Sequence, residues 1–434
     1  MEDYVMLLSE MTKEQLEQFK AQTQAEYDGY KEKGLSLNMA RGKPSSEQLD
    51  LAMKMLAAVN SYDADYKASD GTDCRNYGGL DGIIDAKNLF APMLGVSTDE
   101  LIICGNSSLN IMYDMIARCI IFGVDGVHKP WKDYEKIKWL CPAPGYDRHF
   151  AICESFGIEM ITVPLNEDGP DMDMIEKLIA EDDTIKGVWC VPMYSNPTGI
   201  TYSDEVVRRF AALKPKAEDF RIFWDNAYCI HHLTETPDKL LNILDECKKA
   251  GNEDMVYVFA STSKITFAGG GIAVMAASKK NVDYIKSLMT IQTIGYDKIN
   301  QLRHAKFFKN YEGLMAHMEK HRAIIAPRFE VVLNALDKEI APLGIGSWHK
   351  PNGGYFISFD SMEGCAKRIV ALCKEAGVVL TPAGATYPYG KDPKDCNIRI
   401  APTYPPVEEL EEAMKIFVCA VKLASAEKLL ADMK

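Results

Sequence analysis

The 434-residue sequence has no C-x-x-C pair, no apolar run of membrane-spanning length and no excess of basic charge. A secretory signal peptide has a basic start and a long apolar run, whereas residues 1–15, MEDYVMLLSEMTKEQ, open with acidic side chains. Even the apolar stretch at residues 109–124 carries Asp114 and Arg118, so we expect no membrane span. The net charge of −13 argues against unspecific binding to nucleic acid or to an anionic membrane.

The 12 cysteines are scattered along the chain, and several lie inside apolar runs. Cys104 lies in LIICG and Cys190 in VWCVP. Cysteines in such surroundings are typical of buried free thiols in a reducing compartment. We therefore expect free thiols, a cytoplasmic protein and no bound metal.

The pattern of apolar residues predicts two domains. From about residue 100, short and nearly continuous apolar runs alternate with helical segments, which is typical of a doubly wound α/β domain with a mostly parallel sheet. We expect this large domain to span residues 60–315 and a smaller α+β domain to span residues 316–434. An amphipathic helix at residues 12–33 lies outside the α/β run, so residues 1–59 are expected to join the small domain.

Polar clusters follow several of the predicted strands, and open α/β sheets bind ligands at the carboxyl ends of their strands. GNSS opens a helix, whose N-terminus favours an anion, although Asn and Ser also cap helices routinely. An acidic side chain, a lysine or an arginine that emerges from an apolar strand needs a partner. The clusters GNSS, SNPTG, DNAY, STSK and NIRIAP supply Asn106, Ser107, Ser108, Asn196, Asp225, Tyr228, Ser261, Lys264 and Arg399.

One ligand, pyridoxal 5′-phosphate, would satisfy most of these groups together. Its phosphate suits the helix N-terminus at GNSS and Ser261, and its phenolic oxygen suits Asn196 and Tyr228. Asp225 would keep its ring nitrogen protonated, so that the ring accepts electrons. Lys264 would bind its aldehyde covalently, because an amine of lowered pKa attacks carbonyl groups near neutral pH. Once the substrate displaces it, the same amine is free to carry a proton.

Seven motifs occur in the order NYGGLDG, GNSS, PAPGY, SNPTG, DNAY, STSK and RIAP. Together they resemble the class I aminotransferases of PLP fold type I over essentially the whole chain. NMARGKPS, DKINQLRH and PNGGYF resemble more closely the divergent subgroup of aspartate aminotransferases that is likened to the effector domain of MocR-type regulators. The resemblance implies the PLP-dependent transferase fold and a homodimer with shared active sites.

The resemblance also implies roles for individual residues. Tyr77 would reach the cofactor phosphate of the neighbouring subunit, and Tyr146 would stack on the pyridine ring. Arg399 would bind the substrate α-carboxylate through two parallel hydrogen bonds, with Asn196 beside it. The implied catalytic residues are Lys264, Asp225 and Tyr228, and the implied cofactor-binding residues are Tyr77, Asn106, Ser107, Ser108, Tyr146, Asn196, Asp225, Tyr228, Ser261, Lys264 and Lys298.

The sequence departs from the family at one position. Most relatives have an arginine for the phosphate eight residues after the lysine, where this chain has Ile272. Three glycines precede Ile272, and Lys298 in GYDKINQ is a candidate for the missing positive charge, supplied by the partner subunit.

The expected reaction is transamination of aspartate with 2-oxoglutarate to oxaloacetate and glutamate, by a ping-pong mechanism. The distal carboxylate of such a substrate needs a second cation, for which Arg41 and Lys43 are candidates and Lys298 and Arg303 are rivals. Another amino donor, a β-lyase or decarboxylase, and a non-catalytic PLP-sensing regulator domain stay open as alternatives.

Two other interpretations of the lysine fit less well. The S-x-x-K spacing of Ser261 and Lys264 matches penicillin-binding acylases, but S-D-N and K-T-G are absent. A phosphate-binding loop has its glycines before its lysine, whereas here they follow it.

Overall fold

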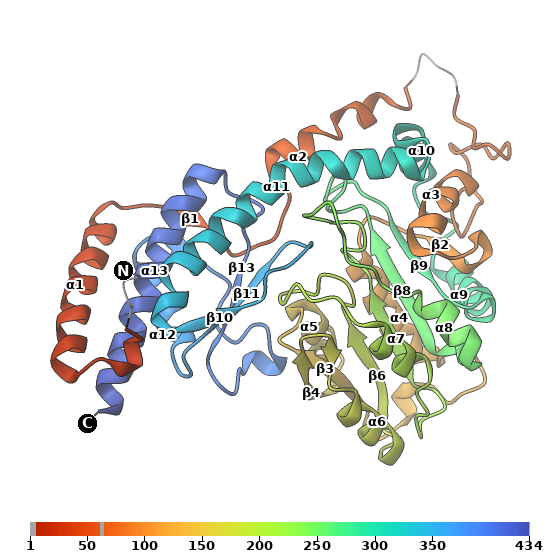
Figure 1. The fold of residues 1–434 in the computed structure, drawn as a ribbon. Helices are drawn as coiled ribbons and strands as arrows, with labels where there is room; N and C mark the ends of the chain where they lie inside the picture. The colour runs from red at the N-terminus through yellow and green to blue at the C-terminus, as the bar shows by residue number, and fades with distance from the viewer. Residues whose placement is uncertain (1–5, 61–64, 434) are drawn as a thin grey trace.

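The computed structural model describes residues 6–60 and 65–433, which form two lobes (Figure 1). The large lobe is built on an eight-stranded sheet, and helices cover both of its faces. The strands are β2 (Leu101–Ile103), β3 (Lys138–Ala143), β4 (Glu159–Asn166), β5 (Gly169–Pro170), β6 (Ile185–Cys190), β7 (Arg221–Asp225), β8 (Val256–Ser261) and β9 (Ala273–Ala276). The helices are α3 (Ile84–Leu94), α4 (Ser108–Phe122), α5 (Asp147–Ser155), α6 (Met172–Glu181), α7 (Asp204–Ala211), α8 (Ile243–Ala250), α9 (Lys279–Gln292) and α10 (Lys298–Phe308).

The strand order is β2-β9-β8-β7-β6-β3-β4-β5. The pairs β8–β7, β7–β6, β6–β3 and β3–β4 are parallel, whereas β9 pairs antiparallel with β2 and β8, and β5 with β4. The predicted doubly wound and mostly parallel sheet is therefore confirmed.

Alternate residues of the central strands enter separate apolar cores on the two faces of the sheet. In β7, Ile222 and Trp224 pack into one core, and Phe223 packs into the other. A strand that is buried on both faces has no polar alternation, which is the pattern that the sequence shows. The polar side chains at the carboxyl ends of these strands are thereby held on a rigid base.

A buried ion pair lies between the sheet and its covering layer. Lys186 Nζ on β6 is 2.7 Å from Asp219 Oδ1, and the Trp131 indole N–H donates to Asp219 Oδ2 at 3.0 Å. Both charged side chains are 2% exposed. Since each charge is desolvated, each depends on the other for its stabilisation.

The small lobe joins both ends of the chain. It contains α1 (Lys13–Glu32), β1 (Leu37–Asn38), α11 (Tyr311–Glu339), β10 (Gly346–Trp348), β11 (Ile357–Ser361), α12 (Ala366–Glu375), β12 (Val378–Val379), β13 (Asn397–Ile400) and α13 (Val407–Asp432). Figure 1 shows α1 lying along α13. The Tyr27 hydroxyl of α1 donates to Leu372 O of α12 at 2.9 Å, and β1 pairs in parallel with β12.

The long helix α11 links the two lobes (Figure 1). Leu314 and Met318 near its start pack into the core of the large lobe, whereas Ile325 and Phe329 pack into the core of the small lobe. The boundary predicted at residue 315 thus falls within a continuous helix, and the domain limits stay a prediction.

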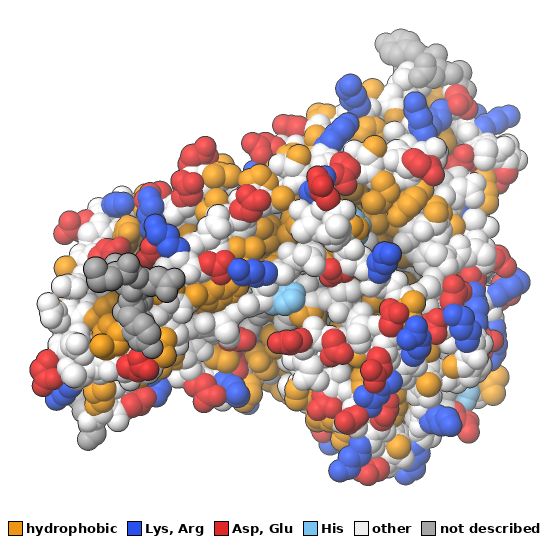
Figure 2. All heavy atoms as spheres, viewed as in Figure 1, with side chains coloured by type: hydrophobic (Ala, Val, Ile, Leu, Met, Phe, Trp, Pro, Cys, Tyr) orange, Lys and Arg blue, Asp and Glu red, His pale blue; other side chains and the backbone are white. Residues whose placement is uncertain are grey.

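The distribution of surface charge and the state of the cysteines agree with what the composition predicts. Acidic and basic side chains are interspersed over the face drawn in Figure 2. All twelve cysteines lie within the described residues and are free, and all but Cys229 are buried, which confirms the expected thiols. Among the helices that the structure describes, none is long and apolar enough to cross a membrane.

Candidate active site

A cavity of about 350 Å³ opens between the lobes, at the carboxyl ends of the central strands. Seven of the predicted site residues line it: Arg41, Lys43, Tyr146, Asn196, Tyr228, Lys264 and Arg399. A larger cavity of about 580 Å³, lined in part by Met93 and Trp224, contains none of the predicted site residues. We therefore take the smaller cavity as the candidate active site.

Lys264 follows β8 in the wall of this cavity. Its Nζ lies 4.9 Å from the ring centre of Tyr228 and 5.8 Å from that of Tyr355. Burial lowers the pKa of the Lys264 amine, and the charge of Asp225 opposes that shift. A lowered pKa increases the fraction of neutral amine, which is the form that attacks a carbonyl group.

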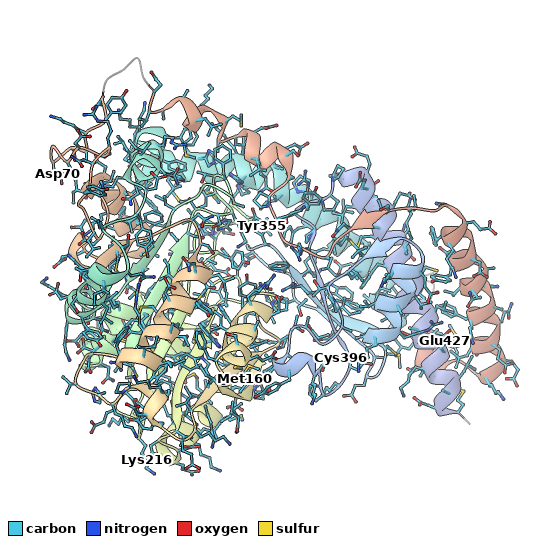
Figure 3. The ribbon with its side chains drawn as sticks, turned by 180° about the vertical axis from the view of Figure 1, so that it is seen from behind. Asp70, Met160, Lys216, Tyr355, Cys396 and Glu427 are labelled. Atoms are coloured by element: carbon cyan, nitrogen blue, oxygen red, sulfur yellow. The ribbon has the colours of Figure 1, made fainter. Side chains whose placement is uncertain are left out.

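The backbone that carries Lys264 is held by side chains from other elements. The Tyr355 hydroxyl donates to Lys264 O at 3.3 Å, and Figure 3 shows Tyr355 between the lobes. His317 and His321 of α11 each place Nε2 within 2.9 Å of Ile265 O. The lysine therefore has a fixed backbone on a junction between the lobes.

The residues that hold this backbone are themselves connected. The Gln48 amide of α2 (Ser46–Asp50) donates to the Tyr355 hydroxyl at 2.9 Å and lies 3.1 Å from His321 Nδ1. If Gln48 donates to Nδ1, the proton of His321 is on Nε2, which then donates to Ile265 O. Gln48 is fully buried, so the network is shielded from water.

Asp225 ends β7 as a buried carboxylate with one satisfied oxygen. Its Oδ2 is 3.1 Å from His149 Nε2, and the His149 ring stacks on Trp189 with centroids 4.5 Å apart. Its Oδ1 has no hydrogen-bond partner among the described residues. Because a buried carboxylate oxygen needs a donor, the site fits a ligand with a protonated ring nitrogen.

The start of α4 and the end of β8 meet beside Lys264. The Ser263 hydroxyl donates to Asn106 O at 2.8 Å, and Ser261 Oγ lies 3.1 Å from Ser263 Oγ. Ser107 precedes the helix but makes no side-chain capping bond within the described part of the chain. The hydroxyl and the first-turn N–H groups of α4 are thus available to a phosphate. This favours the anion-binding interpretation of GNSS over simple capping.

Ile272 is buried and contributes only packing and backbone bonds. Its N–H donates to Thr262 Oγ1 at 2.9 Å, and its carbonyl accepts from Thr262 N at 2.8 Å. A Cβ on the preceding Gly271 would lie 2.9 Å from Thr262 Oγ1, so this close approach requires glycine. Gly271 thus lets the chain after Lys264 pack tightly, whereas Gly269 and Gly270 have no such close neighbours.

Tyr77 and Lys298 lie together but outside the 350 Å³ cavity of their own chain. The Lys298 ammonium donates to Gly78 O at 2.7 Å, which fixes it beside Tyr77. The Tyr77 side chain is 82% exposed. Arg303, the other rival for the distal carboxylate, is likewise absent from the cavity wall.

Arg399 on β13 is buried in the cavity wall and makes four contacts. Its Nη1 donates to Asp147 Oδ1 at 2.9 Å and to Asn196 Oδ1 at 3.3 Å. Its Nη2 donates to Thr381 Oγ1 at 3.3 Å, and the guanidinium lies 4.9 Å from the ring centre of Phe356. The guanidinium is therefore held in one orientation in the cavity wall.

Further cations surround Arg399. Arg41 and Lys43 line the cavity, and Lys43 Nζ lies 3.9 Å from the ring centre of Tyr404. Arg148, at the start of α5, lines it as well. A cavity wall with several cations suits a substrate with more than one carboxylate.

Sequence reasoning missed His149, Asp147, Thr381 and Tyr355. His149 carried a usable signal, because it follows Tyr146 by three residues at a helix start and so shares a face with it. The structure places these two rings 4.9 Å apart in an edge-to-face arrangement. We find no comparable sequence signal for the other three.

Solved structures of similar fold are aminotransferases. The crystal structure of the α-aminoadipate aminotransferase from Thermus thermophilus has a TM-score of 0.72 at 20% identity, over 91% of this chain and 93% of that one. The crystal structure of an aspartate transaminase from Corynebacterium glutamicum has a TM-score of 0.95 at 46% identity, over 98% of this chain and 100% of that one.

The family model "Aspartate amino-transferase" matches residues 11–433, and the chain belongs to this family. An aspartate aminotransferase from C. glutamicum is 47% identical over 97% of this chain and 96% of its own length. The fold and the enzyme class that the sequence motifs implied are thereby confirmed.

Proposed function

We propose that this enzyme transfers the amino group of aspartate to 2-oxoglutarate with pyridoxal 5′-phosphate as its cofactor. The buried oxygen of Asp225 without a partner, on a carboxylate whose charge also acts on the pKa of the Lys264 amine, is the observation that carries the proposal. The name of the C. glutamicum relative supports aspartate as the donor, and the Thermus structure was solved with a phosphopyridoxyl compound.

When bound, the cofactor supplies an aldehyde that accepts the amino group and a ring that accepts electrons. Asp225 keeps a proton on the ring nitrogen, and His149 holds the Asp225 carboxylate in place. Asn196 and Tyr228 would donate to the phenolic oxygen. Lys264 Nζ would hold the aldehyde at rest and, once free, would remove the proton from the substrate α-carbon.

The remaining residues bind and orient the substrate. Arg399 holds the α-carboxylate, and Arg41 or Lys43 holds the distal one. Asn106, Ser107, Ser108 and Ser261 hold the phosphate, and Tyr146 packs against the ring. Fixing both carboxylates and the phosphate sets the α-carbon within reach of Lys264.

A panel of amino donors with 2-oxoglutarate as acceptor tests the proposal. We expect aspartate to give the highest kcat/KM of the donors. Double-reciprocal plots should give parallel lines, because the amino group stays on the enzyme after the first product leaves. Activity with alanine or aromatic donors but not aspartate would refute the substrate, and a sequential pattern would refute the mechanism.

We also propose a homodimer in which Tyr77 and Lys298 serve the partner's phosphate site. Tyr77, Ile291 and Ile294 are large exposed side chains, with exposed fractions of 82%, 84% and 60%. Exposed apolar side chains of this size indicate an interface. Lys298 would then supply the positive charge that Ile272 does not.

Lys298→Ala is expected to raise the Kd of the cofactor at least about tenfold, because a charged phosphate contact is lost. Fluorescence titration of the apoenzyme measures this, with Lys298→Arg as the charge-preserving control. Mixing Lys298→Ala with Lys264→Ala subunits should restore one active site per mixed dimer. An unchanged Kd, or no recovery on mixing, would contradict the assignment.

Three finer proposals rest on the sequence. NMARGKPS, DKINQLRH and PNGGYF support membership of the divergent, MocR-like subgroup. The free thiols support a cytoplasmic location. The domain limits at residues 60 and 315 follow the change from the α/β pattern.

A further inference from the structure

Arg399, which the proposed function assigns to the substrate carboxylate, already binds a carboxylate of its own chain. Asp147 Oδ1 accepts from Arg399 Nη1 at 2.9 Å. Both residues line the 350 Å³ cavity, and their side chains are 7% and 35% exposed for Arg399 and Asp147, respectively. Asp147 is the more accessible partner of the pair.

The hydrogen bonds of Arg399 are incomplete in this arrangement. The two N–H groups of Nη1 reach Asp147 and Asn196, and Nη2 reaches Thr381. The buried Nε has no hydrogen-bond partner among residues 6–60 and 65–433. Since a buried guanidinium donor without an acceptor is costly, a ligand that brings two carboxylate oxygens would satisfy Arg399 better than Asp147 does.

Asp147 has another environment available when it leaves Arg399. It is the first residue of α5, and Tyr146 before it provides no side-chain cap within the described chain. The N–H groups of the first turn and the helix dipole stabilise an acidic side chain there. The neighbouring Arg148 adds a positive charge at the same cavity wall.

We propose that Asp147 is a resident carboxylate that holds Arg399 in the substrate-free enzyme and is displaced by the substrate α-carboxylate. This proposal rests on the assignment of Arg399 in the proposed function. Asp147 neutralises and orients the buried guanidinium between turnovers, at the expense of substrate affinity. Every ligand that uses Arg399 must first separate this ion pair, whatever its distal group is.

Asp147→Asn removes the competing charge and keeps the shape of the side chain. We expect the Kd values of two non-reacting ligands, succinate and propionate, both to fall about tenfold in the holoenzyme. Both ligands carry one carboxylate for Arg399, so their Kd values should fall by similar factors. Isothermal titration calorimetry measures both, and the KM for aspartate should fall in parallel.

Asp147→Glu is the matched control, because it keeps the charge and should leave both Kd values near those of the wild type. Asp147→Ser is a second variant without the charge, in case the amide perturbs the fold. Weaker or unchanged binding of both ligands to the Asn and Ser variants would overturn the proposal. Tightening for succinate alone would place Asp147 at the distal carboxylate, which also overturns it.

The test separates this proposal from the function on which it rests. Ligand binding is measured without turnover, so a failure of aspartate as donor appears only in the wild-type donor panel. Suppose that Asp147→Asn binds both ligands more tightly, but the wild-type enzyme does not accept aspartate as amino donor. The displacement of Asp147 would then be supported, and aspartate would be refuted as the donor.

Discussion

Lys264→Ala is expected to lower kcat by at least about 10⁴-fold, since the variant loses both the covalent anchor and the proton carrier. Stopped-flow absorbance of the aspartate half-reaction measures the loss. The cofactor should still bind through the GNSS helix terminus and Asp225, so cofactor content separates lost chemistry from lost binding. Lys279→Ala, at an exposed lysine of α9 paired with Asp283, is the control and should keep full activity.

Borohydride provides an independent test of the same residue. Reduction of the resting holoenzyme should fix the cofactor to one lysine, and peptide mapping should find it on Lys264. A label on Lys298 or Lys43 instead, or substantial activity in Lys264→Ala, would refute the assignment.

Asp219→Ala is expected to lower the free energy of unfolding by about 3–5 kcal/mol, because it leaves the Lys186 ammonium buried without its partner. Urea unfolding of the apoenzyme, followed by tryptophan fluorescence, measures the change. Trp131, one of five tryptophans, donates to the same carboxylate and contributes to this signal.

An exposed pair and a double variant are the controls for Asp219. Asp204→Ala breaks an exposed pair with Arg208 and should cost at most about 1 kcal/mol. Replacing Lys186 and Asp219 together with Met and Leu should recover most of the stability, since no buried charge then lacks a partner. Equal losses for Asp219→Ala and Asp204→Ala would contradict the expected burial penalty.

The parts of the site that the sequence predicts are those fixed by local pattern. Asp225 is the last residue of β7 and Lys264 comes shortly after the end of β8, and both strands are recognisable by their apolar runs. Adjacent parallel strands end at the same edge of a sheet. The antiparallel direction of β9 was not predictable, because an apolar run is the same in either direction.

The parts that the sequence does not predict depend on contacts across the whole chain. Asp147 and Arg399 are 252 positions apart, and Tyr355 and Lys264 are 91 positions apart. Neither Asp147 nor Tyr355 interrupts a pattern in its own segment, so only the packing of the two lobes shows what they contact. The roles of side chains that act through such distant pairs can be recognised only in the folded structure.

The packing of α1 against α13 has a consequence for biosynthesis. About 400 residues separate Glu32, the end of α1, from Asp432, the end of α13. Because a ribosome adds about 5–20 residues per second, α13 is complete only about 20–80 s after α1. During that time Leu16 and Tyr27, which are buried in the finished fold, lack the surface that covers them. The sheet of the large lobe lies wholly between residues 101 and 276 and can form meanwhile on the nascent chain. The small lobe is therefore the last part of the fold that can close.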